Sequence, residues 1–241
     1  MKHSINYQSW ALFGLAMICT GFVATASAAP ISRMAPVTHV YSPKGFDTND
    51  NTQVVVSGYL PSLCYKAQTS EVKVIGKTIA VTVKALVDER VEFCLQMIVP
   101  FLETVNVGVL DKGTYNVVVN GGSEFESLSN IKVDESSSSA VDNYVYANLD
   151  YVEKVEGSRR VILKGYNPSD CFQFDRVEFI SNSKDTYSVL PIMKQVRPDC
   201  PMKMVPMTIE AEVPKTLSSD LVLLHVRIMD GKSINSLFEN R

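Results

Sequence analysis

Residues 58–64 read GYLPSLC, and residues 165–171 read GYNPSDC. The two stretches lie 107 positions apart and are identical at five of their seven positions. At an offset of 106, CLQMIVP (94–100) matches CPMKMVP (200–206), and both lead into alternating apolar stretches. Two matched landmarks around matched cysteines predict that the chain is an internal duplication.

The N-terminus predicts a secretory signal peptide over residues 1–28. Lys2 precedes an apolar stretch from Trp10 to Val23, and small residues follow it up to Ala28, after which we expect cleavage. The apolar stretch is shorter than the roughly 20 residues that a membrane span needs. Ile18 before Cys19 argues against a lipoprotein signal, which needs a small residue there. We therefore expect a periplasmic or secreted protein without a membrane span after cleavage.

Four cysteines remain after this cleavage, an even number that indicates disulfides in an exported chain. Four cysteines allow three pairings. The nearly equal spacings of 30 and 29 residues, read with the duplication, favour pairs within each repeat: Cys64 with Cys94, and Cys171 with Cys200. On the chain-entropy account, each bond stabilises its domain by roughly 3 to 4 kcal/mol. Zinc is disfavoured, because the pairs lack the close spacing of zinc ligands.

Apolar residues alternate along several segments with the period of two that is typical of strands. These segments should form the inner faces of two packed sheets in each repeat. The expected inward residues are Ile79, Val81, Val83 and Ala85; Val105, Val107 and Val109; Tyr115, Val117 and Val119; Ile209, Ala211 and Val213; Leu224, Val226 and Ile228. The sequence therefore predicts an all-β protein made of two tandem immunoglobulin-like β-sandwich domains, each with one disulfide.

The predicted organisation places the first sandwich at residues 29–133 and the second at residues 143–241. Between them, residues 134–142 contain the polar run DESSSS, which has nothing to bury. Such a run is typical of a flexible linker.

The stretch YSPKGFDTNDNTQVVVSGYLPSLC (41–64), with Cys94 and GTYNVVVNG (113–121), resembles a pattern found in uncharacterised exported bacterial proteins of immunoglobulin-like type. The resemblance implies a fold and a compartment, and no activity accompanies it. It covers mainly the first repeat, because residues 223–228 read LLHVRI where the first repeat has Tyr115 to Val119.

The sequence predicts no catalytic, cofactor-binding or metal-binding residue. Only His39 and His225 follow the signal peptide, which argues against a catalytic triad. Because His225 alternates with Leu224 and Val226, we expect it to face outward beside Arg227.

Three other groups have ordinary structural interpretations. The loop at 47–51 (DTNDN) lacks the glutamate and glycine of a calcium-binding hand and favours a turn. The charged residues Asp88, Glu89, Arg90 and Glu92 favour a solvated loop. Met202, Met204 and Met207 could hold copper(I), but the offset of 106 aligns Met204 with Ile98 and Met207 with Phe101, which favours core positions.

The leading functional hypothesis is a non-enzymatic module of the cell envelope that binds an unidentified protein or surface. Without residues 1–28 the chain has 22 basic and 26 acidic residues, a net charge of −4, which argues against nucleic acid. The alternatives are a protease inhibitor that presents Pro61 to Cys64, a periplasmic chaperone of the pilus type, and a copper-binding protein. The chaperone would need a longer strand to lend than Tyr115 to Val119.

Overall fold

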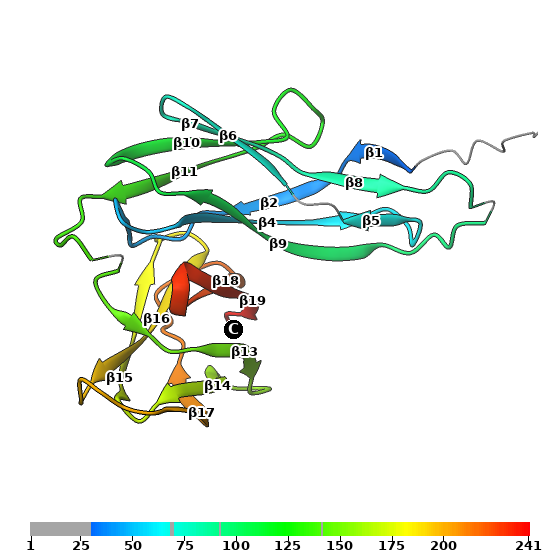
Figure 1. Ribbon diagram of the computed structural model, residues 1–241. Coiled ribbons are helices and arrows are strands. Elements are labelled where there is room, and N and C mark those ends of the chain that lie inside the picture. Colours follow the sequence, from blue (N-terminus) through cyan, green and yellow to red (C-terminus); the bar gives the residue numbers. More distant parts are fainter. Residues whose placement is uncertain (1–29, 68–69, 92, 141) are drawn as a thin grey trace, which may run out of the picture.

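The computed structural model describes residues 30–67, 70–91, 93–140 and 142–241 (Figure 1). The predicted signal peptide over 1–28 lies outside the described residues. Two separate hydrophobic cores are present, one built from residues between Ala35 and Val133 and the other from residues between Ala147 and Phe238. The prediction of an all-β protein with two sandwiches is confirmed.

The first sandwich combines a three-stranded sheet, in the order β2-β4-β9, with a larger sheet, in the order β3-β11-β10-β7-β6. β8 follows β7 after one residue, and it pairs with β1 and β5. The bounds are β1 (Ile31–Met34), β2 (Val37–Tyr41), β3 (Phe46–Asp47), β4 (Thr52–Leu60), β5 (Tyr65–Ala67), β6 (Glu71–Ile75), β7 (Thr78–Thr82), β8 (Lys84–Val87), β9 (Val99–Gly108), β10 (Gly113–Val119) and β11 (Ser127–Asp134).

The second sandwich repeats this arrangement with a three-stranded sheet, β13-β14-β17, and a larger sheet, β12-β16-β18-β19, in which β15 also pairs with β16. In both sandwiches one pair of long strands is parallel, β7 with β10 and β16 with β18. The bounds are β12 (Val145–Tyr146), β13 (Leu149–Lys154), β14 (Arg160–Ser169), β15 (Phe172–Ser181), β16 (Thr186–Gln195), β17 (Met202–Glu212), β18 (Leu221–Ile228), the 3-10 turn η1 (Met229–Gly231) and β19 (Lys232–Glu239).

The alternating residues lie as predicted, with one exception. Fifteen of the sixteen residues expected to face inward are buried or half-buried in the two cores. Val109 is 67% exposed because β9 ends one residue earlier, at Gly108, where a φ of +95° turns the chain. The prediction for Val109 is therefore wrong.

The glycine of the repeated motif is required where the chain changes sheets. In the first sandwich the chain leaves β1, which pairs with β8, and enters β2 in the sheet β2-β4-β9. Between these strands the Pro36 carbonyl accepts a hydrogen bond from the Tyr59 amide at 3.1 Å. A Cβ on the neighbouring Gly58 would lie 2.1 Å from the same carbonyl oxygen. Only glycine allows this close approach.

The second sandwich makes the same change of sheet between β12 and β13. The Asn148 carbonyl accepts from the Tyr166 amide at 3.0 Å, and a Cβ on Gly165 would lie 2.2 Å from that oxygen. Both crossings also carry a register shift in the pairing of the entering strand. Glycine is therefore required at this position of both repeats for the same steric reason.

Both predicted disulfides are present, with Cα–Cα distances of 5.8 Å for Cys64–Cys94 and 5.5 Å for Cys171–Cys200. The serine two residues before the first cysteine of each pair fixes the turn. The Ser62 hydroxyl accepts from the Cys64 amide, and the Ser169 hydroxyl accepts from the Cys171 amide at 3.2 Å. The motif therefore shapes the turn that presents each cysteine.

Replacing Gly58 with alanine should lower the free energy of unfolding by about 3 kcal/mol, because a backbone shift must relieve the contact with Pro36 and loses a buried hydrogen bond. Urea denaturation measures this change. Gly76→Asn is the control: Gly76 has a φ of +59°, which asparagine tolerates, and open space around it, so the loss should stay below about 1 kcal/mol. Equal effects of the two substitutions would contradict this account of the motif.

Candidate functional site

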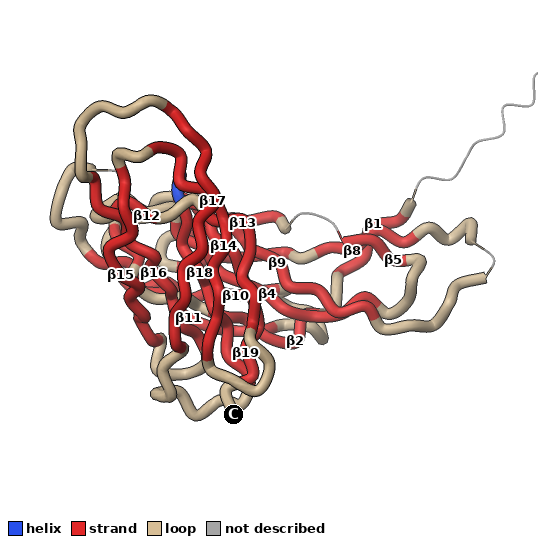
Figure 2. The backbone as a smooth tube through the Cα atoms, turned by 90° about the horizontal axis from the view of Figure 1, so that it is seen from below, coloured by secondary structure: helices blue, strands red, loops and turns tan. Residues whose placement is uncertain are grey.

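The two sandwiches are joined by an extensive junction that packs one sheet against another. The outer face of β2, β4 and β9 in the first sandwich lies on the outer face of β18 and β19 in the second (Figures 1 and 2). Its apolar centre consists of Tyr41, Val55 and Leu223, with Leu102 and Leu237 packed beside them.

This junction explains two apolar runs that do not alternate. In Val54-Val55-Val56, the outer two side chains lie in the first core and Val55 lies in the junction. In Val222-Leu223-Leu224, Leu223 lies in the junction and its neighbours lie in the second core. A strand that is buried on both faces has a continuous apolar run instead of an alternating one. These runs were the sequence signal for the junction.

His225 does not face solvent, so that prediction is wrong. The alternation along β18 holds, but the first sandwich covers the face that His225 occupies, and the side chain is fully buried. His225 Nδ1 lies 2.8 Å from Asn235 Oδ1, and the Asn235 amide nitrogen donates to Thr104 Oγ1 on β9 at 2.7 Å. Burial lowers the pKa of His225 to about 3, so the imidazole is neutral at physiological pH.

Arg227, two residues further along β18, is a buried cation held by the first sandwich. Its guanidinium donates to Asp50 Oδ2 at 3.1 Å and to the Gly45 carbonyl at 2.6 Å. It also lies 4.3 Å from the centroid of the Phe46 ring. Ion pairing, hydrogen bonding and cation–π contact together offset the cost of burying this charge.

The loop predicted as a plain turn supplies these contacts. The turn is present, since the Asn49 amide donates to Asp47 Oδ1 at 2.9 Å and the Asp47 amide donates to Asp50 Oδ2 at 2.8 Å. Beyond turning the chain, the loop reaches the second sandwich through Asp50 and through Asn51, whose side chain donates to the Gly231 carbonyl at 3.2 Å. The resemblance pattern GFDTNDN therefore coincides with the domain junction.

The polar run between the sandwiches, predicted as a flexible linker, is tied to the same loop. Asn49 Nδ2 lies 2.8 Å from Ser136 Oγ, 2.8 Å from the Ser138 carbonyl and 2.7 Å from the Ala140 carbonyl. Asn143 donates from its side chain to Asp47 Oδ2 at 2.9 Å. The run buries no apolar residue, but hydrogen bonds from the loop hold it in place.

His39 and Asp185 form a second polar contact across the junction. His39 Nε2 lies 2.8 Å from Asp185 Oδ2, and Asn182 and Thr186 each donate to Asp185 Oδ1 at 2.9 Å. Burial alone would raise the pKa of Asp185, but these hydrogen bonds outweigh it and lower the pKa to about 2. The carboxylate is thus stabilised in its charged form.

The junction contains a small polar cavity of about 10 Å³ and, beside it, a groove of about 360 Å³. His225 and Arg227 line the cavity, and Tyr144 and Asp230 line the groove. Burial raises the pKa of Asp50 and of Asp142, against the lowering effect of Arg227. Both spaces share five lining residues: Asp50, Asn51, Asp142, Tyr146 and Gly231.

A different surface lies at the end of the first sandwich that projects beyond the second (Figures 1 and 2). The segment between β8 and β9 exposes several large apolar side chains around the Cys64–Cys94 disulfide, and Phe93 is the most exposed at 82%. We call this surface the apolar tip; its residues are Leu63, Val91, Phe93, Leu95, Met97 and Ile98.

The charged residues predicted as a solvated loop flank this tip. Asp88 and Arg90 pair with each other, and Glu89 pairs with Arg33 on β1. Hydrogen bonds from Arg90 lower the pKa of Asp88 to about 2. Glu92 lies outside the described residues.

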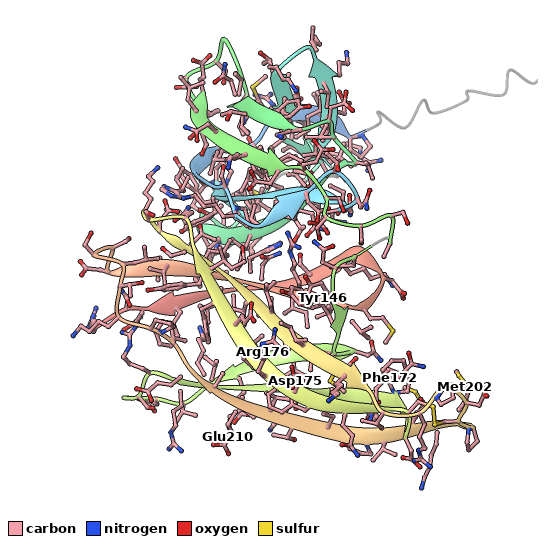
Figure 3. The ribbon with its side chains drawn as sticks, turned by 90° about the vertical axis from the view of Figure 1, so that its left-hand side faces the viewer. Tyr146, Phe172, Asp175, Arg176, Met202 and Glu210 are labelled. Atoms are coloured by element: carbon pink, nitrogen blue, oxygen red, sulfur yellow. A yellow bond between two sulfur atoms is a disulfide. The ribbon has the colours of Figure 1, made fainter. Side chains whose placement is uncertain are left out.

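The three methionines do not share one face. Met202 is 86% exposed and Met204 is 59% exposed, whereas Met207 packs against the second core. The core position predicted for Met207 is confirmed, and the one predicted for Met204 is wrong because Ile98, its counterpart, is itself exposed. Figure 3 shows Met202 beside Phe172 at one end of the second sandwich, away from Tyr146 near the junction.

The segments Pro61 to Cys64 and Tyr115 to Val119 both belong to the first sandwich. In Pro61 to Cys64, Ser62 is buried and its hydroxyl lies 3.1 Å from Cys94 Sγ, so only Leu63 of this turn points outward to a large extent. β10, which contains Tyr115 to Val119, is hydrogen-bonded to β7 on one side and to β11 on the other. It therefore has no free edge to offer a client chain.

Within residues 30–67, 70–91, 93–140 and 142–241, no three His, Cys, Asp or Glu side chains are grouped as a metal site requires. No helix in the same ranges is long and apolar enough to cross a bilayer.

Comparison with known proteins gives one match. The family model described as the ORF11 beta-sandwich domain matches residues 54–128, from β4 into β11, so this part of the chain is similar to that domain. No curated protein and no solved structure matches the chain.

Removing one partner of the buried ion pair should be far more costly than removing both. Arg227→Met should lower the free energy of unfolding by about 3 to 5 kcal/mol, because Asp50 is left buried without its cation. Asp50→Asn combined with Arg227→Met should recover part of this loss, since no buried charge remains. A double-mutant cycle by urea denaturation measures the coupling, and additive losses would contradict the pairing.

The stability of the protein should fall as the pH falls from about 4 to about 2. Asp185 has a folded pKa of about 2 against an ordinary value of 3.8, so its contribution is present above pH 4 and is lost as the carboxylate takes up a proton. Asp185→Asn should be less stable than the wild type at pH 6 and should lose less stability on acidification. Urea denaturation between pH 2 and pH 6 tests this, and parallel curves for the two proteins would refute it.

Proposed function

We propose that this protein is an exported, non-enzymatic binding module that contacts a partner protein through the apolar tip of its first sandwich. The observation that carries the proposal is the exposure of the tip, where large apolar side chains gather on one disulfide-tied segment. Contiguous exposed apolar surface on a folded domain is typical of an interaction site.

The spacing of the apolar residues along the tip supports its role as a contact surface. Val91, Phe93, Leu95 and Met97 recur at every second position and are all exposed. Cys94, between them, bonds to Cys64 and ties the segment to the body of the sandwich. The apolar side chains therefore project outward from an anchored segment, the reverse of the arrangement in a core strand.

The charges near the tip are already paired within the chain, Asp88 with Arg90 and Arg33 with Glu89. These two pairs neutralise four charges at the edge of the tip, which favours an apolar contact with a partner over electrostatic attraction. Export is supported by the two disulfides, which form and persist in oxidising compartments.

A protein partner is favoured over a lipid surface by the backbone of the tip. Within the described residues, the amides of Phe93, Leu95 and Ile98 have no hydrogen-bond acceptor in the chain. Burying such groups in hydrocarbon costs several kcal/mol each. A protein partner can accept these hydrogen bonds, as in the addition of a strand to a sheet edge.

A photo-crosslinking residue at position 93 should trap a discrete protein adduct in cells that export the protein. Leu128, an exposed apolar residue on β11 away from the tip, is the matched control position and should give none. Phe93→Ser, tested with the crosslinker at position 97, should reduce the adduct by about tenfold, as expected for an aromatic anchor of an interface.

Three outcomes would contradict the proposal: equal adducts at positions 93 and 128, a lipid adduct at position 93, or an adduct unaffected by Phe93→Ser. Turnover of a substrate by the purified protein, abolished by a single side-chain change, would contradict its non-enzymatic part. Circular dichroism and urea denaturation of each variant establish that the sandwiches remain folded.

A further inference from the structure

The domain junction contains a recess that the proposed function does not use. Its outer part is the groove of about 360 Å³, within the range of roughly 300 to 1,000 Å³ that is usual for small-molecule sites. Four segments from distant parts of the chain form it: the loop around Asn49 to Asn51, Val109 after β9, residues 142–146 and the turn η1. Its inner part is the cavity of about 10 Å³ in front of His225 and Arg227.

Two residues that line the inner cavity, His225 and Arg227, each carry a buried polar atom that no described protein atom satisfies, one an acceptor and the other a donor. The side-chain nitrogen of Asn235 donates to Thr104 and Ser233, so Asn235 Oδ1 must accept from His225 Nδ1–H. His225 Nε2 is then a bare acceptor, and it is fully buried. Arg227 Nε–H is a donor, also buried and unpaired, because the other guanidinium nitrogens make the contacts with Asp50 and Gly45.

A hydroxyl group suits this pair chemically, because one hydroxyl offers both the donor that His225 Nε2 lacks and the acceptor that Arg227 Nε–H lacks. The cavity volume is about that needed to hold a single water-sized oxygen. Larger polar groups do not fit its inner end.

The two parts of the recess carry charges of opposite sign, so an ion that occupied both parts would meet repulsion in one of them. A cation that entered the inner cavity would meet Arg227 and Lys232, which both line it. An anion in the groove would meet Asp142 and Asp230, neither of which has an ion-pair partner within the described residues. A neutral ligand with several hydroxyl groups meets neither repulsion and can donate to these carboxylates.

The groove also offers an aromatic surface. Tyr144 is 41% exposed, and its ring centroid lies 6.4 Å from that of Tyr146, which is buried beside Arg227. An exposed aromatic ring with a polar edge packs well against the apolar C–H face of a sugar ring. Val109 and Val145 add apolar contact beside it.

We propose that this recess is a binding site for a neutral carbohydrate, with one sugar hydroxyl in the inner cavity and the sugar ring against Tyr144. The site is independent of the apolar tip, so either proposal can fail without the other.

The test is an NMR titration of the purified protein with glucose, galactose, mannose and N-acetylglucosamine, each to roughly 50 mM, which detects dissociation constants on the order of 10 mM. At least one sugar should shift the backbone amides of Tyr144 and Gly231 together with the side-chain Nε–H signal of Arg227. Butylammonium and acetate, which probe cationic and anionic ligands, should leave all three signals in place.

Variants at the aromatic surface separate binding from folding. Tyr144→Ala should weaken sugar binding by about tenfold, and Tyr144→Phe should stay within about twofold of the wild type, because the ring is kept. Tyr151→Ala is the matched control, since Tyr151 is a similarly exposed tyrosine on β13 and does not line the recess. The proposal is overturned if none of the four sugars shifts the Arg227 signal, if either charged probe does, or if Tyr144→Ala and Tyr151→Ala behave alike.

Discussion

The buried guanidinium of Arg227 is the interaction on which the arrangement of the two sandwiches depends. Arg227 lies on β18 of the second domain, but most of its contacts are with the first domain. Its guanidinium donates hydrogen bonds to Asp50 and to the Gly45 carbonyl, and it lies over the ring of Phe46. A buried charge is tolerated only with such partners, so the junction cannot open without exposing Arg227 to water or leaving Asp50 unpaired. This constraint converts a loop that otherwise makes a simple turn into part of the interface, and it places the polar recess between the domains.

The junction is asymmetric although the two domains are repeats. The first domain contributes its three-stranded sheet, with Val55 at the centre, whereas the second contributes its larger sheet, with Leu223 at the centre. Such a head-to-tail contact could continue indefinitely if the second domain offered the same face as the first. The second domain does not offer the same face. The outer face of its three-stranded sheet carries two ion pairs, Glu153 with Lys164 and Arg160 with Glu210. Figure 3 labels Glu210, which lies on the edge strand β17. The second repeat therefore differs from the first in the charge of the face with which the first repeat forms the junction.

The sequence was informative wherever one local pattern decided the structure. The matched motifs predicted the duplication and both disulfides, and strict alternation predicted nearly all of the inward residues, because each depends on neighbours within one repeat. The junction depends instead on contacts between residues about 180 positions apart, such as Asp50 with Arg227. Alternation correctly placed His225 on the face opposite Leu224, but it could not show that another domain covers that face. The continuous runs Val54 to Val56 and Val222 to Leu224 carried this information, since a strand with one solvent face has no reason to be apolar on both.

The same distinction explains why the two surfaces of interest differ in kind. The apolar tip is local: a disulfide fixes the Cys94 segment, and its exposed alternating side chains are visible in the sequence once the bond is known. The recess at the junction exists only when both domains are docked, because the loop around Asp50 and the strand that carries Arg227 form its inner walls together. Any ligand that binds there stabilises the docked arrangement, since binding to the folded, closed state alone shifts the equilibrium toward it. A rigid pair of sandwiches is therefore a physical requirement of the recess, whereas the tip needs only the first domain and its disulfide.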